Sequence, residues 1–167
     1  NDDQYKVIVS VGRLVNQKNF SLLIKAFKKV KEQLPEAKLI ILGEGPEKQK
    51  LKYLIEELEM EKDVTLEGFV QNPYSYMKES DLFVLSSKWE GFGNVIVEAL
   101  ATGVPVVSTK CPSGPDEILE NGKFGYLVNL NDVEQMSTAI LHELSTPSAD
   151  EKKRKARAEK FSVESAT

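Results

Sequence analysis

Short apolar stretches alternate along the chain with longer stretches in which apolar residues recur at helical spacing. The short stretches have the length and composition of buried strands. Six strands are predicted: Lys6 to Val11, Lys38 to Leu42, Val64 to Leu66, Asp81 to Ser86, Pro105 to Ser108 and Gly125 to Val128. Helices are predicted between them: Phe20 to Val30, Pro46 to Leu58, Tyr74 to Lys78, Asn94 to Ala101, Pro115 to Glu120 and Val133 to Leu144. This alternation predicts a doubly wound α/β domain whose parallel six-stranded sheet is covered on both faces.

The whole chain, residues 1–167, is predicted to form a single domain. With 167 residues, of which 41% are hydrophobic, it is large enough to bury one core. Pro46 is expected at the first position of the second helix, because its ring fixes the backbone angle that a helix start needs. The segment Ala149 to Phe161 is predicted to be helical but strongly polar. Residues 149–167 are therefore expected to form a peripheral, solvent-facing tail, truncated because no cap or turn signal follows.

Composition narrows the chemistry that the chain can support. A net charge of -4 gives no overall attraction to nucleic acid. Cys111 is the only cysteine, which excludes an internal disulfide, and its thiol is expected to be inert. His142 is the only histidine, so neither a histidine-based metal site nor a serine–histidine–aspartate triad is expected. Any chemistry must come from carboxylates, cations and backbone groups.

The sequence suggests a cytoplasmic location. No apolar run approaches the roughly 18 residues that a membrane span requires, and the segment Asn1 to Gln4 does not resemble a secretory signal. The basic segment Lys152 to Lys160 leaves two interpretations open, which are contact with the inner face of a membrane and a solvated helix. Glu151 and Glu159 interleave with its positive charges and favour the solvated helix.

The loop after the first predicted strand carries two cations. In a parallel sheet, ligands bind beyond the carboxyl ends of the strands. The segment Gly12 to Asn19 has one glycine where a dinucleotide fingerprint needs three, so a nicotinamide or flavin role is not expected. Arg13 and Lys18 are five residues apart and suit a diphosphate group. Taken alone, such a pair is more often two solvated loop charges, so the pair by itself does not establish a diphosphate site.

A second loop, Lys88 to Asn94, follows the fourth predicted strand and opens a helix. Its two glycines allow backbone amides to approach a ligand closely, and the helix adds free amides and a positive dipole end. Glu90 is placed on the loop to accept bonds from hydroxyl groups. Glu98 lies one turn beyond the helix start and can face the same cleft. Spacing alone also allows a plain loop charge and a plain helix surface charge.

The stretch from Glu90 to Glu98, in which seven residues separate the two glutamates, looks like the paired-glutamate signature of glycosyltransferase family 4. Further segments resemble that family in the same order: Gly12 to Leu14, Lys18 to Phe20, Leu42 to Pro46, Val64 to Val70, Ala99 to Val107, Glu117 to Ile118 and Gly125 to Val128. The similarity covers nearly the whole chain. Several ordered motifs on the predicted loops are more specific than any one of them.

The resemblance implies a retaining enzyme of GT-B architecture, in which two Rossmann-like domains face each other across a cleft. The chain is similar to the C-terminal, donor-binding domain, and the N-terminal acceptor domain is absent from it. The implied reaction needs no metal and no cofactor, and it passes a glycosyl group from a nucleotide-diphosphate sugar to a saccharide or lipid-linked acceptor in surface polysaccharide or glycan synthesis. The stretch Cys111 to Glu117 departs from the glycine-rich stretch common in the family and resembles a bacterial subset in which UDP-sugars are frequent donors, so the resemblance favours a UDP-sugar. The isolated chain is expected to be inactive, since half of the cleft is missing.

The resemblance also assigns residues to the site. The implied donor-binding residues are Gly12, Arg13, Lys18, Gly68, Phe69, Val70, Glu90, Phe92, Gly93, Asn94, Val95 and Glu98. Arg13 and Lys18 would offset the charge of the leaving diphosphate, so with Glu90 they are the implied catalytic residues. Glu90 would bind hydroxyls of the donor sugar, and Glu98 would bind those of the ribose.

Two rival functions are weighed against this one. The first is a nucleotide-sugar-binding or interaction module of the same fold without turnover, which the joint presence of Arg13, Lys18, Glu90 and Glu98 disfavours. The second is a sugar-phosphate epimerase of similar architecture. That enzyme would call for histidines in its cleft, and His142 lies far along the chain.

Overall fold

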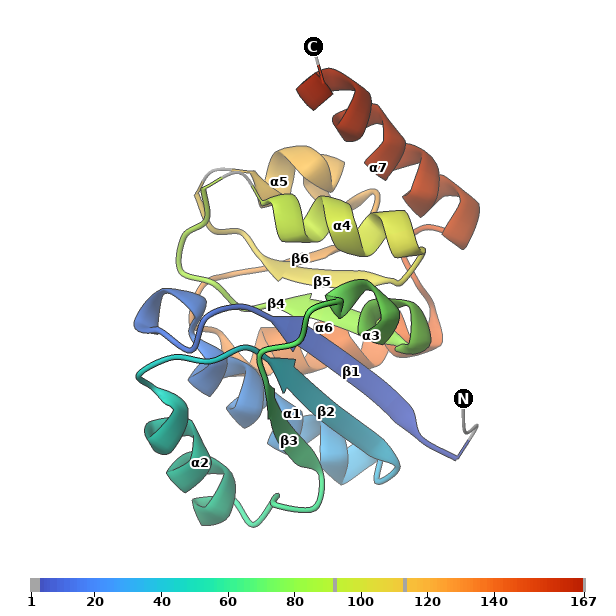
Figure 1. The fold of residues 1–167 in the computed structure, drawn as a ribbon. Helices are drawn as coiled ribbons and strands as arrows, with labels where there is room; N and C mark the ends of the chain where they lie inside the picture. Colours follow the sequence, from blue (N-terminus) through green and yellow to red (C-terminus); the bar gives the residue numbers. More distant parts are fainter. Residues whose placement is uncertain (1–3, 92, 113, 167) are drawn as a thin grey trace.

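The computed structural model describes residues 4–91, 93–112 and 114–166, with side chains up to residue 161. Within these residues it contains one six-stranded, all-parallel sheet with the order β3-β2-β1-β4-β5-β6 (Figure 1). The strands are β1 (Lys6–Val11), β2 (Ala37–Leu42), β3 (Val64–Gly68), β4 (Leu82–Leu85), β5 (Val106–Thr109) and β6 (Tyr126–Val128). The strand order reverses between β1 and β4, as in doubly wound folds. The predicted fold class is confirmed.

Helices cover both faces of the sheet (Figure 1). They are α1 (Phe20–Gln33), α2 (Lys48–Glu57), α3 (Pro73–Glu79), α4 (Asn94–Thr102), α5 (Pro115–Ile118), α6 (Val133–Ser145) and α7 (Glu151–Ala166), with the 3-10 turns η1 (Asn16–Lys18) and η2 (Glu120–Gly122). Buried side chains of α1, α2 and α6 form one hydrophobic core with the sheet, and those of α3, α4, α5 and α7 form a second on the opposite face. Successive strand residues face opposite cores, and both faces are buried, so the strands are hydrophobic along their whole length.

The start of α2 differs from its prediction. The helix begins at Lys48, while Pro46 and Glu47 lie in a turn before it. The Glu47 amide donates to the Leu14 carbonyl at 2.9 Å, so this turn is tied to the loop after β1 instead of continuing the helix. The prediction that Pro46 opens the helix is therefore wrong by two residues.

The tail helix α7 packs along α4 and is not solvated on all sides (Figure 1). Ala158 and Arg154 are buried on its inner face. The Arg154 guanidinium donates through Nε to the Gly103 carbonyl at 2.7 Å and also donates to the Ala149 carbonyl. Burial lowers the pKa of this guanidinium. The expectation of a solvent-facing tail is wrong for this inner face, because two buried positions in a polar segment leave little hydrophobic signal in the sequence.

None of the helices in the described part of the chain is both long enough and apolar enough to cross a membrane.

Candidate functional site

The candidate site lies at the carboxyl edge of the sheet, where the loops after the parallel strands converge. Two loops that are far apart in the sequence are joined there. The Lys88 amide donates to the Gln17 carbonyl at 2.8 Å, and Gln17 Nε2 donates to the Trp89 carbonyl at 2.8 Å. Ser86 Oγ donates to the Lys18 carbonyl at 2.7 Å. These bonds hold the loop after β1 against the loop after β4.

Close backbone packing shapes the first of these loops. The Gly12 amide donates to the Leu42 carbonyl at 2.9 Å, and the buried Leu14 side chain anchors the loop to the core. Gly43 has φ +145°, and a Cβ atom built on it would lie 1.8 Å from the Gly12 carbonyl oxygen. Only glycine satisfies both conditions. The glycine at position 43 thus permits the close approach of the loops after β1 and β2.

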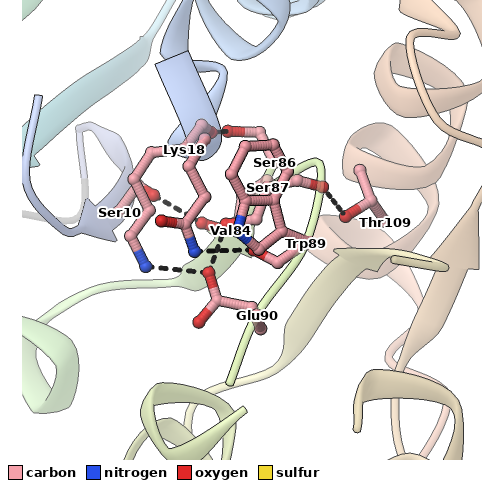
Figure 2. Close-up of polar contacts among 9 residues, drawn as sticks. Ser10, Lys18, Val84, Ser86, Ser87, Trp89, Glu90 and Thr109 are labelled. Carbon is pink, nitrogen blue, oxygen red and sulfur yellow. Dashed lines mark hydrogen bonds and ion pairs between the residues drawn. The ribbon is translucent and has the colours of Figure 1, made fainter. Parts of the chain in front are cut away.

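The chemical centre of the site is an ion pair between Lys18 and Glu90 (Figure 2). Lys18 Nζ lies 2.8 Å from Glu90 Oε2, and the two side chains are only 17% and 9% exposed. Ser87 Oγ donates to the same carboxylate oxygen at 2.6 Å. A cation and a carboxylate held together in this way offer one group for an anion and one for hydroxyls, and each neutralises the other while no ligand is bound.

Arg13 occupies different surroundings from Lys18. It is exposed and lines a pocket of about 510 Å³ beside the ion pair's loop. The pocket is lined by Val11, Gly12, Arg13, Leu42, Gly43, Glu44, Phe69, Val70, Gln71 and Pro73. Phe69, with 76% of its surface exposed, provides an aromatic side chain at this pocket. The pocket therefore combines apolar walls with one cation, Arg13, and one carboxylate, Glu44, and its apolar walls suit a heterocyclic base.

Gly68 ends β3 beneath this pocket with φ +88°, and a Cβ atom there would lie 2.8 Å from Glu44 Oε2. Glu44 is one of the pocket residues that the sequence reasoning missed, together with Gln71 and Pro73. Glu44 lies in the Leu42 to Pro46 segment that carries part of the family resemblance, so the resemblance offered a reason to consider it as a site residue. Gln71 and Pro73 belong to none of the motifs that the sequence analysis identified.

The helix α4 holds the remaining predicted residues. Gly93 precedes it in the left-handed conformation, with φ +71°, and Asn94 and Val95 form its first turn. Glu98 lies further along, partly buried, and burial raises the pKa of its carboxyl group. The pKa of the Tyr74 hydroxyl on α3 is raised as well, first by burial and second by the negative charge of Glu98.

One predicted residue cannot be placed. Phe92 lies outside the residues that the structure describes. The part of the chain that is described contains no group of three or more His, Cys, Asp or Glu side chains placed to hold a metal ion. Cys111 is buried, and burial raises the pKa of its thiol.

The pKa of Glu98 predicts a pH-dependent stability. Because its pKa is raised on folding, the folded state binds more protons than the unfolded state above the ordinary value of 4.5, and stability falls as the pH rises through the folded pKa. Glu98→Gln removes this loss. We expect the variant to be more stable than the wild type at pH 7, by less than about 1 kcal/mol because the group keeps access to solvent, and equal to it near pH 4. Urea unfolding at both pH values measures the difference, and a variant that is less stable at pH 7 would contradict it.

The fold and this edge of the sheet define a Rossmann-like α/β domain with a paired cation and carboxylate on the loops that follow β1 and β4. A family model described as "Glycosyl transferases group 1" matches residues 1–161. The chain therefore belongs to that family of glycosyltransferases.

A relative from Campylobacter jejuni is 43% identical over 151 residues, which are 90% of this chain and 40% of the relative. It is named N-acetylgalactosamine-N,N'-diacetylbacillosaminyl-diphospho-undecaprenol 4-alpha-N-acetylgalactosaminyltransferase. The chain thus spans less than half of the length of this relative. It matches a region of a longer enzyme.

Solved structures of GT-B glycosyltransferases share the fold. Staphylococcus aureus TarM, in complex with fondaparinux, alpha-GlcNAc-glycerol and UDP, matches with a TM-score of 0.89 and 30% identity over 97% of this chain and 34% of TarM. Anabaena HepE, in complex with UDP and glucose, matches with a TM-score of 0.85 and 27% identity over 94% of this chain and 44% of HepE. Both solved neighbours are nucleotide-bound complexes.

Proposed function

We propose that this chain is the donor-binding domain of a retaining glycosyltransferase of family 4 and that its donor is a UDP-sugar. The observation that carries the proposal is the 2.8 Å pair of Lys18 and Glu90 at the carboxyl edge of the sheet. Lys18 shares the loop after β1 with Arg13, which lines the pocket of about 510 Å³. One cation can bind a phosphate and one carboxylate can bind sugar hydroxyls. The UDP bound by TarM and HepE supports uracil as the base.

In the proposed reaction, Arg13 and Lys18 hold the donor diphosphate and offset the negative charge that grows as its bond to the anomeric carbon breaks. An acceptor hydroxyl oxygen forms the new bond on the same face of the sugar. Its proton passes to the leaving phosphate oxygen, so that configuration is retained and no side-chain base is needed. Fixed cations supply the charge stabilisation, and the proposal includes neither a metal nor a cofactor.

The other residues position the donor. Glu90 accepts hydrogen bonds from hydroxyls of the sugar, and Glu98 accepts them from the ribose. The donor-contacting backbone groups are proposed to be those of Gly12, Gly68, Phe69, Val70, Phe92, Gly93, Asn94 and Val95. The exposed ring of Phe69 is suited to stack on the base. Burial of Glu98 favours a role in binding, because a partly desolvated carboxylate gains most from a hydroxyl donor.

The acceptor is proposed to be a saccharide or a lipid-linked glycan, held by an acceptor domain outside this chain, in surface polysaccharide or glycan synthesis. The lipid-linked acceptor in the name of the Campylobacter relative supports this class. The proposed site of action is the cytoplasm, at the inner face of the membrane. Exposed Lys152 and Lys153 on α7 would add electrostatic attraction to anionic lipids. Alone, the chain should bind the donor and transfer nothing.

Isothermal titration calorimetry of the chain with UDP, GDP, ADP and CDP tests the proposal. We expect UDP to bind with a dissociation constant at least about fivefold lower than those of the other three, a difference of about 1 kcal/mol. A tighter GDP or ADP complex would leave the glycosyltransferase donor site intact but refute uracil as the base. No heat with any nucleotide at millimolar concentration would refute the donor site of this chain.

Metal removal gives a separate prediction. The affinity for UDP should be unchanged within twofold when EDTA replaces added Mg²⁺, because Arg13 and Lys18 are proposed to neutralise the diphosphate. The same calorimeter measures both conditions. A loss of binding in EDTA that Mg²⁺ restores would contradict metal independence.

A further inference from the structure

A buried cluster of hydroxyl groups lies beneath the Lys18–Glu90 pair, and the proposed reaction does not yet use it (Figure 2). Ser87 is fully buried in the loop that follows β4. Its Oγ donates to Glu90 Oε2 at 2.6 Å, and a serine hydroxyl has only one proton to donate. The structure thus commits a buried donor to this carboxylate, three residues further along the chain.

Ser87 is itself held from the neighbouring strand. Thr109, fully buried at the end of β5, donates through Oγ1 to the Ser87 carbonyl at 2.7 Å. Figure 2 shows Thr109 on the far side of Ser87 from Glu90. This bond anchors the Ser87 backbone and so keeps the Ser87 hydroxyl within reach of Glu90.

Both donors use the same carboxylate oxygen. Lys18 Nζ lies 2.8 Å from Glu90 Oε2, which is also the oxygen that Ser87 bonds. Within the described residues, no hydrogen bond to Glu90 Oε1 is found. Among the contacts of the described residues, Oε1 is the oxygen that a ligand hydroxyl would meet in our proposal, and its direction depends on what holds Oε2.

A donor diphosphate competes for one of these two contacts. If Lys18 binds phosphate, its ammonium group must leave or share Glu90, and the carboxylate then keeps only the neutral, anchored hydroxyl. The diphosphate does not attract Ser87 away from Glu90, because the serine hydroxyl is uncharged and buried.

We propose that Ser87 is a positioning residue that fixes Glu90 for the donor sugar while Lys18 exchanges the carboxylate for the diphosphate. The inference rests on the proposed function, because it assigns the sugar to Glu90 and the phosphate to Lys18. It assigns separate roles to the two residues. Lys18 contributes affinity for the nucleotide, and Ser87 contributes the additional affinity for the sugar by positioning Glu90.

The test compares UDP with UDP-N-acetylglucosamine, UDP-N-acetylgalactosamine and UDP-glucose in calorimetric titrations of Ser87→Ala. We expect UDP to bind as in the wild type within twofold, and the tightest UDP-sugar to lose about tenfold in affinity, as for a lost bond to a charged group. Ser87→Thr keeps the hydroxyl and should restore the sugar affinity. An equal loss for UDP and UDP-sugar, or no loss for either, would overturn the proposal.

Ser10→Ala is the matched control. Ser10 is also fully buried, and its Oγ donates to the Val84 carbonyl at 2.6 Å without touching Glu90. It should lower thermal stability about as much as Ser87→Ala and leave the ratio of UDP-sugar to UDP affinity unchanged. If Ser87→Ala does not fold, Ser87→Cys keeps the shape with a much weaker donor and should show the same selective loss.

A ligand-free measurement separates the inference from the proposed function. Side-chain scalar couplings of Glu90 should report one rotamer in the wild type and rotamer averaging in Ser87→Ala. A wild type that binds no nucleotide would refute the proposed function, yet averaging confined to Ser87→Ala would still support Ser87 as the residue that positions Glu90. A single Glu90 rotamer in both proteins would overturn the positioning role whatever the nucleotide result.

Discussion

Lys18→Ala is expected to weaken UDP binding by about 10- to 100-fold. A hydrogen bond between two charged groups contributes about 1.5–3 kcal/mol, and each 1.4 kcal/mol is a factor of ten in affinity. The Lys18 side chain is only 17% exposed and already restricted, so little side-chain entropy opposes its contact with a phosphate. Calorimetric titration with UDP and with uridine measures the effect, because uridine has no phosphate and should bind both proteins alike.

Two variants control this result. Lys52→Ala removes the same charge from an exposed position on α2 and should leave UDP affinity within twofold of the wild type. Lys18→Arg keeps the charge but changes the geometry of its donors, and should retain part of the affinity. Equal losses in Lys18→Ala and Lys52→Ala would mean that overall charge, and not this site, attracts the nucleotide. Unchanged affinity in Lys18→Ala would remove Lys18 from the donor site.

Gly43→Ala is expected to destabilise the fold by about 3–5 kcal/mol. Its Cβ atom would lie 1.8 Å from the Gly12 carbonyl oxygen, so the backbone of two loops must move apart. The positive φ of +145° adds a strain of about 1–3 kcal/mol for a residue with a side chain. For a domain of this size, the melting temperature should fall by about 10 °C or more.

Differential scanning calorimetry measures the loss, and Gly91→Ala is its control. A Cβ atom on Gly91 meets nothing within 4 Å, so that variant should melt within about 2 °C of the wild type. The opening of the loops in Gly43→Ala should also weaken UDP binding, since Gly12 and Gly43 both line the pocket. A Gly43→Ala protein as stable as Gly91→Ala would contradict the close packing of these two loops.

The strands were predictable because buried parallel strands are apolar on both faces. Lys6 to Val11 was assigned with its bounds unchanged, and the carboxyl edge followed from the alternation of strands and helices. The inner face of α7 was not predictable, because Arg154 reads as a surface charge and is buried only through its bonds to backbone carbonyls. Propensity alone cannot report a contact with another helix.

The charged residues proposed for the site could be selected from the sequence, but their arrangement in space could not. Arg13, Lys18 and Glu90 stood out as charges on loops beside glycines. Their pairing did not, because Lys18 and Glu90 are 72 residues apart and meet only through the sheet. Ser87 gave no signal, since a serine just after a strand is common and its value comes from burial and from its single bond to Glu90.

The central claim is that the loops after β1 and β4 form one donor site, and a titration of the isotopically labelled chain with UDP, followed by nuclear magnetic resonance, tests it most directly. The account predicts shifts of backbone amides clustered between Gly12 and Lys18 and between Gly93 and Glu98, lost in Lys18→Ala and kept in Lys52→Ala. Shifts confined to another part of the surface, or shifts that survive unchanged in Lys18→Ala, would contradict it.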